Sequence, residues 1–249
     1  MNFDLIVDFF KGLKRQGPGS AECTKRALDL SGLSDRSDPL KIADIGCGTG
    51  ASTLVLAEEL DAHITAVDLF DRFLDSLTDN AEKQGLNQKI DTLTCSMDSL
   101  PFSQSSLDAI WSEGAIYNMG FEKGIRYFKP FLKTGGILAV SEITWLSKDR
   151  PIEISRYWNK NYPEIALASE KISQLEDQGF RLKGYFPLPE NCWRKQYYEP
   201  MLNQMDEFLA RHQTSEAEEF IAAETEEIEL YKKHHHFYSY GFYVAEKIE

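Results

Sequence analysis

Residues 40–50 read LKIADIGCGTG, an apolar run of strand character that leads directly into three closely spaced glycines. The glycines at positions 46, 48 and 50 permit a tight turn and let a ligand approach the backbone without meeting a Cβ atom. Residues 51–59 are typical of a helix, and a helix N-terminus offers free backbone N–H groups. This succession predicts a binding site for an adenosine-bearing cofactor.

The turn alone leaves the identity of that cofactor open. Gly46-x-Gly48-x-x-Ala51 also fits the dinucleotide-binding fingerprint, with alanine in the third position. Asp68 ends the next apolar run at 62–68, where a carboxylate would accept hydrogen bonds from ribose hydroxyls. An NAD-dependent oxidoreductase is therefore one interpretation of these two features.

Two further segments are not part of the dinucleotide fingerprint. They are MDSLPF at 97–102 and the apolar run LDAIWSEG at 107–114. With them, residues 40–146 resemble the class I S-adenosylmethionine-dependent methyltransferases, and residues 237–245 are similar to that family's antiparallel last strand. Within the family, the chain looks most like the ubiquinone/menaquinone-type group, which acts on small molecules.

This resemblance implies a cofactor and a role for each matching residue. The cofactor would be S-adenosylmethionine, with Asp44 and the glycine turn at its methionine end and Asp68 at its ribose. Asp98 would bind the adenine amino group. The full set of implied cofactor residues is Asp44, Gly46, Gly48, Gly50, Asp68, Leu69, Met97, Asp98 and Glu113.

The methyl acceptor is expected to meet side chains from the strand ends and from the segment before the last strand. These candidates are Glu113, Tyr117, Asn118, Glu142, Trp145, Trp193, Tyr197 and His236. We predict His236, Glu113 and Tyr117 as catalytic residues, since histidine is the side chain that titrates nearest neutral pH and is the default general base. Three successive histidines more often form a solvated junction than a metal site, and no metal is predicted.

The alternation of strand and helix patterns from residue 40 to residue 140 indicates an α/β protein with a parallel sheet. Together with the resemblance, it predicts a Rossmann-like, doubly wound, mostly parallel seven-stranded sheet with an antiparallel last strand. We expect one methyltransferase domain over 1–249, with an N-terminal helical cover at 1–39, a cofactor-binding core at 40–146 and a helical insertion or lid at 190–233.

The predicted topology places the insertion near the site. Ligands of such sheets bind outside the carboxyl ends of the parallel strands. A last strand that runs antiparallel to the others begins at that same edge. His236 and the insertion should therefore lie at the rim of the site. The acidic runs at 216–219 and 224–227 are expected to form a solvated helix face.

Composition narrows the classes of partner. The 27 basic and 40 acidic side chains give a net charge of −13, which disfavours nucleic acid and anionic membrane surfaces. The four cysteines show no paired spacing, and the start MNFD lacks the basic and apolar character of a secretory signal. A cytoplasmic location is expected.

The sequence thus predicts a methyltransferase that uses S-adenosylmethionine and a small-molecule methyl acceptor, with the acceptor atom open. Two alternatives remain: the NAD-dependent oxidoreductase, and a catalytically silent S-adenosylmethionine-binding protein with a regulatory role. A homodimer is an option for its assembly.

Overall fold

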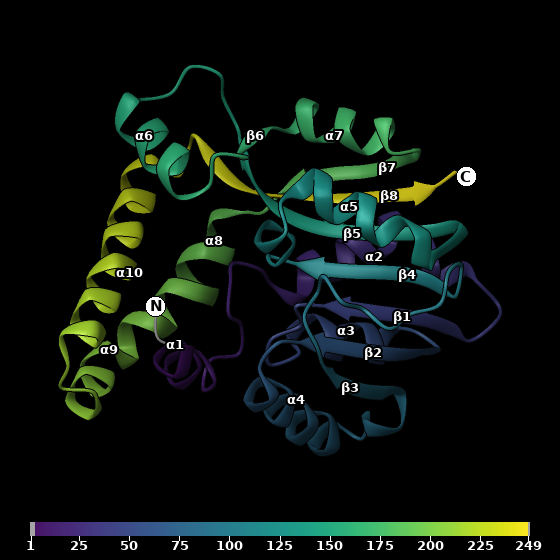
Figure 1. Ribbon diagram of the computed structural model, residues 1–249, viewed down its shortest axis with the longest axis horizontal. Helices are drawn as coiled ribbons and strands as arrows, with labels where there is room; N and C mark the ends of the chain where they lie inside the picture. Colours follow the sequence, from purple (N-terminus) through teal and green to yellow (C-terminus); the bar gives the residue numbers. More distant parts are fainter. Residues whose placement is uncertain (1–2, 249) are drawn as a thin grey trace.

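The computed structural model describes residues 3–248 (Figure 1). The helices are α1 Phe3–Phe10, α2 Ala21–Ser31, α3 Ala51–Glu59, α4 Asp71–Gln84, α5 Phe121–Phe128, α6 Ile152–Asn161, α7 Ala168–Asp177, α8 Glu190–Trp193, α9 Glu199–Arg211 and α10 Ser215–His234. The strands are β1 Leu40–Ile45, β2 Ala62–Asp68, β3 Ile90–Thr94, β4 Leu107–Glu113, β5 Leu132–Trp145, β6 Ala166–Leu167, β7 Phe180–Pro187 and β8 Tyr238–Lys247. Short 3₁₀ turns (η1 Leu33–Asp35, η2 Asn87–Lys89, η3 Ile116–Asn118, η4 Lys129–Phe131) and a π-helical segment (η5 Arg194–Tyr198) complete the elements.

The strands form one sheet in the order β3-β2-β1-β4-β5-β8-β7, with the two-residue β6 paired to β5. Strands β1 to β5 pair in parallel, whereas β8 is antiparallel to both β5 and β7. The chain order reverses between β1 and β4, and such a switch point is where open α/β sheets bind their ligands. The prediction of a mostly parallel Rossmann-like sheet with an antiparallel last strand is confirmed.

Helices cover both faces of the sheet. On one face, α2, α3 and α4 pack over a large apolar cluster that contains Ile42, Ile64 and Trp111. On the other, α5 and α7 pack over a cluster that contains Ile110 and Leu138. Because the central strands are covered on both sides, β4 is buried along nearly its whole length.

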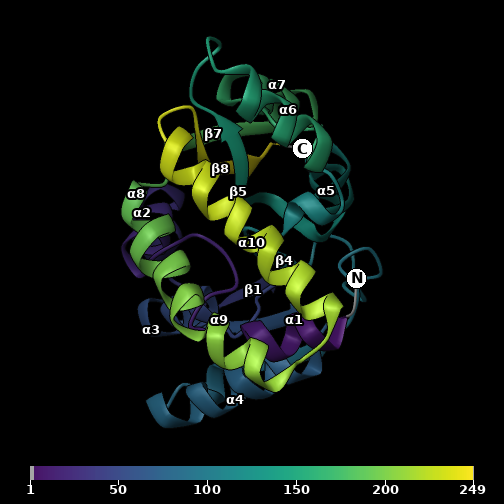
Figure 2. The same cartoon turned by 90° about the vertical axis from the view of Figure 1, so that its left-hand side faces the viewer.

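A layer of helices lies beyond the carboxyl ends of the parallel strands. Figures 1 and 2 show α1, α9 and α10 together at this edge, with α10 running diagonally across the view of Figure 2. Phe9 of α1 packs edge-on against Phe208 and Phe220, with ring centroids 5.1 and 5.3 Å apart. The Asp8 carboxylate adds an ion pair to Arg211 at 3.0 Å. The N-terminal cover and the insertion therefore form one continuous layer.

The helical parts of the chain contain two irregular stretches. Helix α5 ends at Phe128 and tightens into a 3₁₀ turn, because Pro130 has no backbone N–H to continue the ladder. The insertion consists of α8, the π-helical η5, α9 and α10. Strand β6 is an addition to the seven strands that were expected.

Candidate active site

A cavity of about 670 Å³ lies between the carboxyl ends of the strands and the helical layer. Its wall is formed by the glycine turn after β1, the ends of β2 and β4, the segment after β3, and residues of α1, α6, α10 and η5. A volume in this range is typical of sites that hold small molecules and cofactors.

The glycine turn forms part of the cavity wall and depends on left-handed backbone. Gly46, Gly48 and Gly50 have φ values of 71°, 55° and 86°, a region that other residues rarely adopt. A Cβ atom at Gly46 would collide with the Cβ of Ala115, so this position admits no side chain. Gly50 does not line the cavity: it precedes α3, and a Cβ there would collide with Leu77.

The Asp68 carboxylate, at the end of β2, forms a hydrogen bond with the glycine turn. Its Oδ2 accepts a hydrogen bond of 2.8 Å from the Gly48 N–H, and its Oδ1 accepts one of 3.0 Å from the Phe70 N–H. Burial raises the pKa of the Asp68 carboxyl, and these backbone donors oppose the rise. The side chain lines the cavity together with Leu69.

Met97 and Asp98 reach the same cavity from the segment after β3. Asp98 is exposed, and a hydrogen bond from Ser96 lowers the pKa of its carboxyl. The structure therefore brings together the ends of three parallel strands, as the resemblance implied.

Asp44 is placed differently from what the resemblance implied. It is fully buried behind the glycine turn and is not part of the cavity wall. Its Oδ2 accepts hydrogen bonds from Ser52 Oγ at 2.8 Å and Thr53 Oγ1 at 2.7 Å, while Oδ1 has no hydrogen-bond partner within residues 3–248. Burial raises the pKa of Asp44 to about 7. Asp44 therefore links the end of β1 to the start of α3.

Gln16 of the N-terminal cover forms hydrogen bonds with the glycine turn. The Thr49 N–H donates to Gln16 Oε1 at 2.9 Å, and Gln16 Nε2 donates to Thr49 Oγ1 at 3.1 Å. Gln16 itself lines the cavity. Gln16 was not foreseen as a site residue, because its partner is 33 residues away in the chain.

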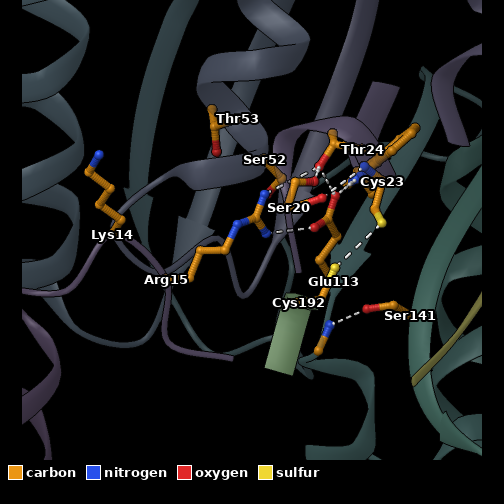
Figure 3. A network of polar contacts seen from close by, with 12 residues as sticks. Lys14, Arg15, Ser20, Cys23, Thr24, Ser52, Thr53, Glu113, Ser141 and Cys192 are labelled. Atoms are coloured by element: carbon orange, nitrogen blue, oxygen red, sulfur yellow. Dashed lines mark hydrogen bonds and ion pairs between the residues drawn. The ribbon is translucent and has the colours of Figure 1, made fainter. Parts of the chain in front are cut away.

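Glu113, at the end of β4, is held by three donors. Its Oε2 accepts from Arg15 Nη1 at 2.9 Å, and its Oε1 accepts from Thr24 Oγ1 at 2.7 Å and Trp111 Nε1 at 2.9 Å. Figure 3 shows Arg15 and Thr24 converging on this carboxylate. The side chain is only 7% exposed. With its oxygens engaged in this way, Glu113 joins the cover to the sheet and does not present a free base.

A pair of cysteines lies next to this network. Cys23 Sγ of α2 and Cys192 Sγ of α8 are 3.6 Å apart (Figure 3), so the cover and the insertion also meet here. Arg15, Thr24 and these cysteines were not foreseen as neighbours of Glu113, because only the packing of α2 and α8 brings them together.

The acceptor candidates fall into two groups. Five of them line the cavity, namely Glu113, Tyr117, Asn118, Trp193 and Tyr197. Tyr117 also packs against Tyr162 in a T-shaped arrangement, with ring centroids 6.1 Å apart.

The other three candidates do not line the cavity. His236 lies at the expected edge, but its side chain is exposed and packs on the His235 ring at 3.8 Å, because the turn after α10 places it on the outer surface. Glu142 is buried in an ion pair with Lys171 at 3.4 Å, and Trp145 is buried in the core. The structure thus argues against His236 as the general base.

The expectation of a wholly solvated acidic face on α10 is wrong. Phe220, Glu224 and Glu227 line the cavity, whereas Glu218 and Glu226 are exposed. The first three have the spacing i, i+4, i+7, which places them on one side of a helix. That spacing was the available signal in the sequence.

Three buried carboxyls make stability sensitive to pH. Burial raises the pKa of Asp44 and Glu142 to about 7 and that of Glu224 to about 8, from ordinary values of 3.8 and 4.5. The folded protein therefore binds more protons than the unfolded chain, and the free energy of unfolding should fall as pH rises from about 5 to about 7. Denaturant titrations across this range test the prediction. Asp44→Asn should flatten the slope, and a stability that rises with pH would contradict it.

Comparison with known proteins identifies a matching family model and several relatives. A family model described as a methyltransferase domain matches residues 42–136. The chain is 26% identical over 179 residues to sterol 24-C-methyltransferase ERG6A of Gibberella zeae, covering 68% of this chain and 46% of that protein. It is 24% identical over 163 residues to phosphoethanolamine N-methyltransferase 1 of Arabidopsis thaliana, covering 65% of this chain and 32% of that protein. The chain thus spans less than half the length of either relative.

A solved structure extends the likeness to nearly the whole chain. A SAM-dependent methyltransferase from Geobacter sulfurreducens, in complex with S-adenosyl-L-homocysteine, has a TM-score of 0.82 at 16% identity and covers 98% of both chains. At this identity the likeness is one of fold. Residues 42–136 thus match a methyltransferase domain, and nearly the whole chain shares the fold of a SAM-dependent methyltransferase.

Proposed function

We propose that this protein transfers a methyl group from S-adenosylmethionine to a small-molecule acceptor. The observation that carries the proposal is a single cavity whose wall joins the glycine turn and Asp68 to the helical layer. One part of the wall thus suits a nucleoside cofactor, and the other is built from side chains of the cover and the insertion. The complex of the Geobacter sulfurreducens protein with S-adenosyl-L-homocysteine supports the choice of cofactor.

The residues present fit such a cofactor. Gly46 lines the cavity, and Ala115 leaves no room there for a side chain, so bare backbone borders the cavity at this point. In the proposal, Gly46 and Gly48 meet the methionine end and Asp68 accepts from the ribose hydroxyls. Leu69 and Met97 bracket the adenine, and Asp98 binds its amino group.

The cofactor supplies an activated methyl group on a positive sulfur, so the protein must chiefly orient the acceptor and exclude water. We assign exclusion of water to the cover, which Gln16 and the contact between Arg15 and Glu113 hold against the sheet, and to the insertion, which packs on the cover. Tyr117, next to the end of β4, is proposed to contact the acceptor. His236 has no part in this proposal.

The test is turnover of S-adenosylmethionine to S-adenosylhomocysteine, measured with fractionated cell extract as the source of acceptor. We expect product only when both extract and protein are present. Calorimetry with S-adenosylmethionine and NAD separates the two enzyme classes: tight NAD binding without S-adenosylmethionine binding would contradict the proposal. Binding of S-adenosylmethionine with no turnover on any fraction would favour the silent regulatory alternative.

The state of the cysteines bears on the location of the protein. All four cysteines are free thiols, which is usual in a reducing compartment, and we therefore propose a cytoplasmic protein. Within residues 3–248, no helix is both long and apolar enough to cross a membrane.

A further inference from the structure

Two carboxylates face the cavity without a cation to balance them. Across residues 3–248, neither Glu224 nor Glu227 takes part in an ion pair, and Glu224 has no hydrogen-bond partner among them. Glu227 Oε1 accepts a hydrogen bond of 2.9 Å from the Tyr198 hydroxyl. Burial and the neighbouring Glu227 raise the pKa of Glu224 to about 8, so its charged form lacks a stabilising partner.

The same part of the cavity has aromatic walls. Its aromatic side chains are Trp158, Tyr162, Trp193, Tyr197, Phe220 and Tyr240. They come from α6 and its C-terminal flank, α8, η5, α10 and β8, so aromatic residues border the site from several sides. The faces of such rings attract cations, most strongly when water is excluded.

The charge of the whole lining favours a positive ligand. Five carboxylates line the cavity, against the basic side chains of Arg15 and Lys123. Arg15 is already paired with Glu113. An anionic acceptor would therefore be repelled, and a purely apolar acceptor would leave the buried carboxylates without compensation.

The acidic pair does not belong to the elements proposed to hold the cofactor. The proposed cofactor residues belong to the glycine turn and the ends of β2 and β3, whereas Glu224 and Glu227 belong to α10. Burial raises the pKa values of the acceptor candidates Tyr117 and Tyr197, and the negative charges of Glu224 and Glu227 raise them further. The acidic pair is thus associated with the acceptor part of the cavity.

We infer that the methyl acceptor is an aliphatic amine, held in a cage made by Glu224, Glu227 and the aromatic walls. This inference rests on the proposed function and names the substrate class of the same site. Sequence likeness alone does not select it, because the relatives include both carbon and nitrogen methyltransferases by name.

The chemistry balances with groups present at the site. An amine that enters in its ammonium form would first give one proton to the Glu224 carboxylate, which frees the nitrogen lone pair. That lone pair would form the N–C bond to the methyl group, while the C–S bond breaks with its electron pair going to sulfur and leaves a neutral thioether. The positive charge would then lie on the methylated nitrogen, opposite Glu227 and the aromatic walls, and the Glu224 proton would return to water.

Binding of choline tests the cage independently of turnover. Its trimethylammonium group is compared, by NMR titration, with the neutral isostere in which carbon replaces nitrogen. We expect the protein to bind choline about tenfold or more tightly than the isostere, as a cation in an aromatic and acidic site should bind. The titration is repeated with S-adenosylhomocysteine, whose sulfur is neutral, so that the cofactor part of the cavity is filled.

Substitutions identify the carboxylates responsible. Glu224→Gln should remove most of the preference for choline, and Glu227→Gln should reduce it while keeping an acceptor for the Tyr198 hydroxyl. Glu226→Gln, an exposed position on the same helix, is the matched control and should bind choline like the parent. Circular dichroism verifies that each variant folds.

Equal binding of choline and its isostere would overturn the inference, as would no choline binding or an unchanged preference in folded Glu224→Gln. The proposed function fails separately, through absence of S-adenosylmethionine binding in the same calorimetric assay. A protein that binds S-adenosylmethionine but shows no preference for choline would keep the proposed function and lose the amine.

Discussion

Replacement of Gly46 by valine is expected to abolish measurable cofactor binding. Gly46 has φ 71°, where an L-residue costs about 1–2 kcal/mol and a β-branched one more. A Cβ atom would also collide with the Cβ of Ala115, so either the turn or the start of η3 must move. We expect the affinity for S-adenosylmethionine, measured by calorimetry, to fall at least about 100-fold.

The chain contains a matched control for backbone strain. Gly85, at the end of α4, has the same φ of 71°, but a Cβ atom there would meet nothing within 4 Å. Gly85→Val should therefore lower the free energy of unfolding and leave cofactor affinity intact. If Gly46→Val binds S-adenosylmethionine like the parent while remaining folded, the glycine turn is not part of the cofactor site.

Asp68→Ala is expected to weaken binding of S-adenosylmethionine by about 1.5–3 kcal/mol, the usual range for hydrogen bonds to a charged group. The ribose hydroxyls would lose their acceptor. The backbone N–H groups of Gly48 and Phe70 would lose theirs as well, so the turn itself becomes less well held. Calorimetry gives the affinity, and denaturant titration gives the accompanying loss of stability.

Two companion variants separate these effects. Asp68→Asn keeps one carbonyl oxygen as an acceptor, and its affinity should lie between those of the parent and Asp68→Ala. Asp71→Ala removes an exposed carboxylate that does not line the cavity, and it should bind the cofactor normally. Parent-like affinity in folded Asp68→Ala would exclude Asp68 from the ribose site.

The cofactor part of the cavity was predictable because its signals are local. The turn at 46–50 requires backbone that glycine adopts most readily, and Asp68 and Asp98 follow apolar runs whose ends meet at one edge of a parallel sheet. Alternation of strands and helices therefore sufficed to bring residues from separate segments together.

The acceptor part was not predictable in this way. Glu113 was a fair candidate for a base until Arg15 and Thr24, at sequence separations of 98 and 89 residues, proved to engage it. His236 was placed at the correct edge, but the direction of its side chain depends on how α10 ends.

The sequence by itself determined the sheet, the glycine turn and the edge at which ligands bind, since these follow from hydrophobic period and backbone conformation over short stretches. Only the tertiary structure decided which face of α10 turns inward, and with it that Glu224 and Glu227 enter the cavity. The physical reason is that an acidic helix has several faces that water can solvate, so its sequence does not fix which face turns inward. Packing of Phe220 and Ile228 against distant partners such as Phe9 selects the orientation.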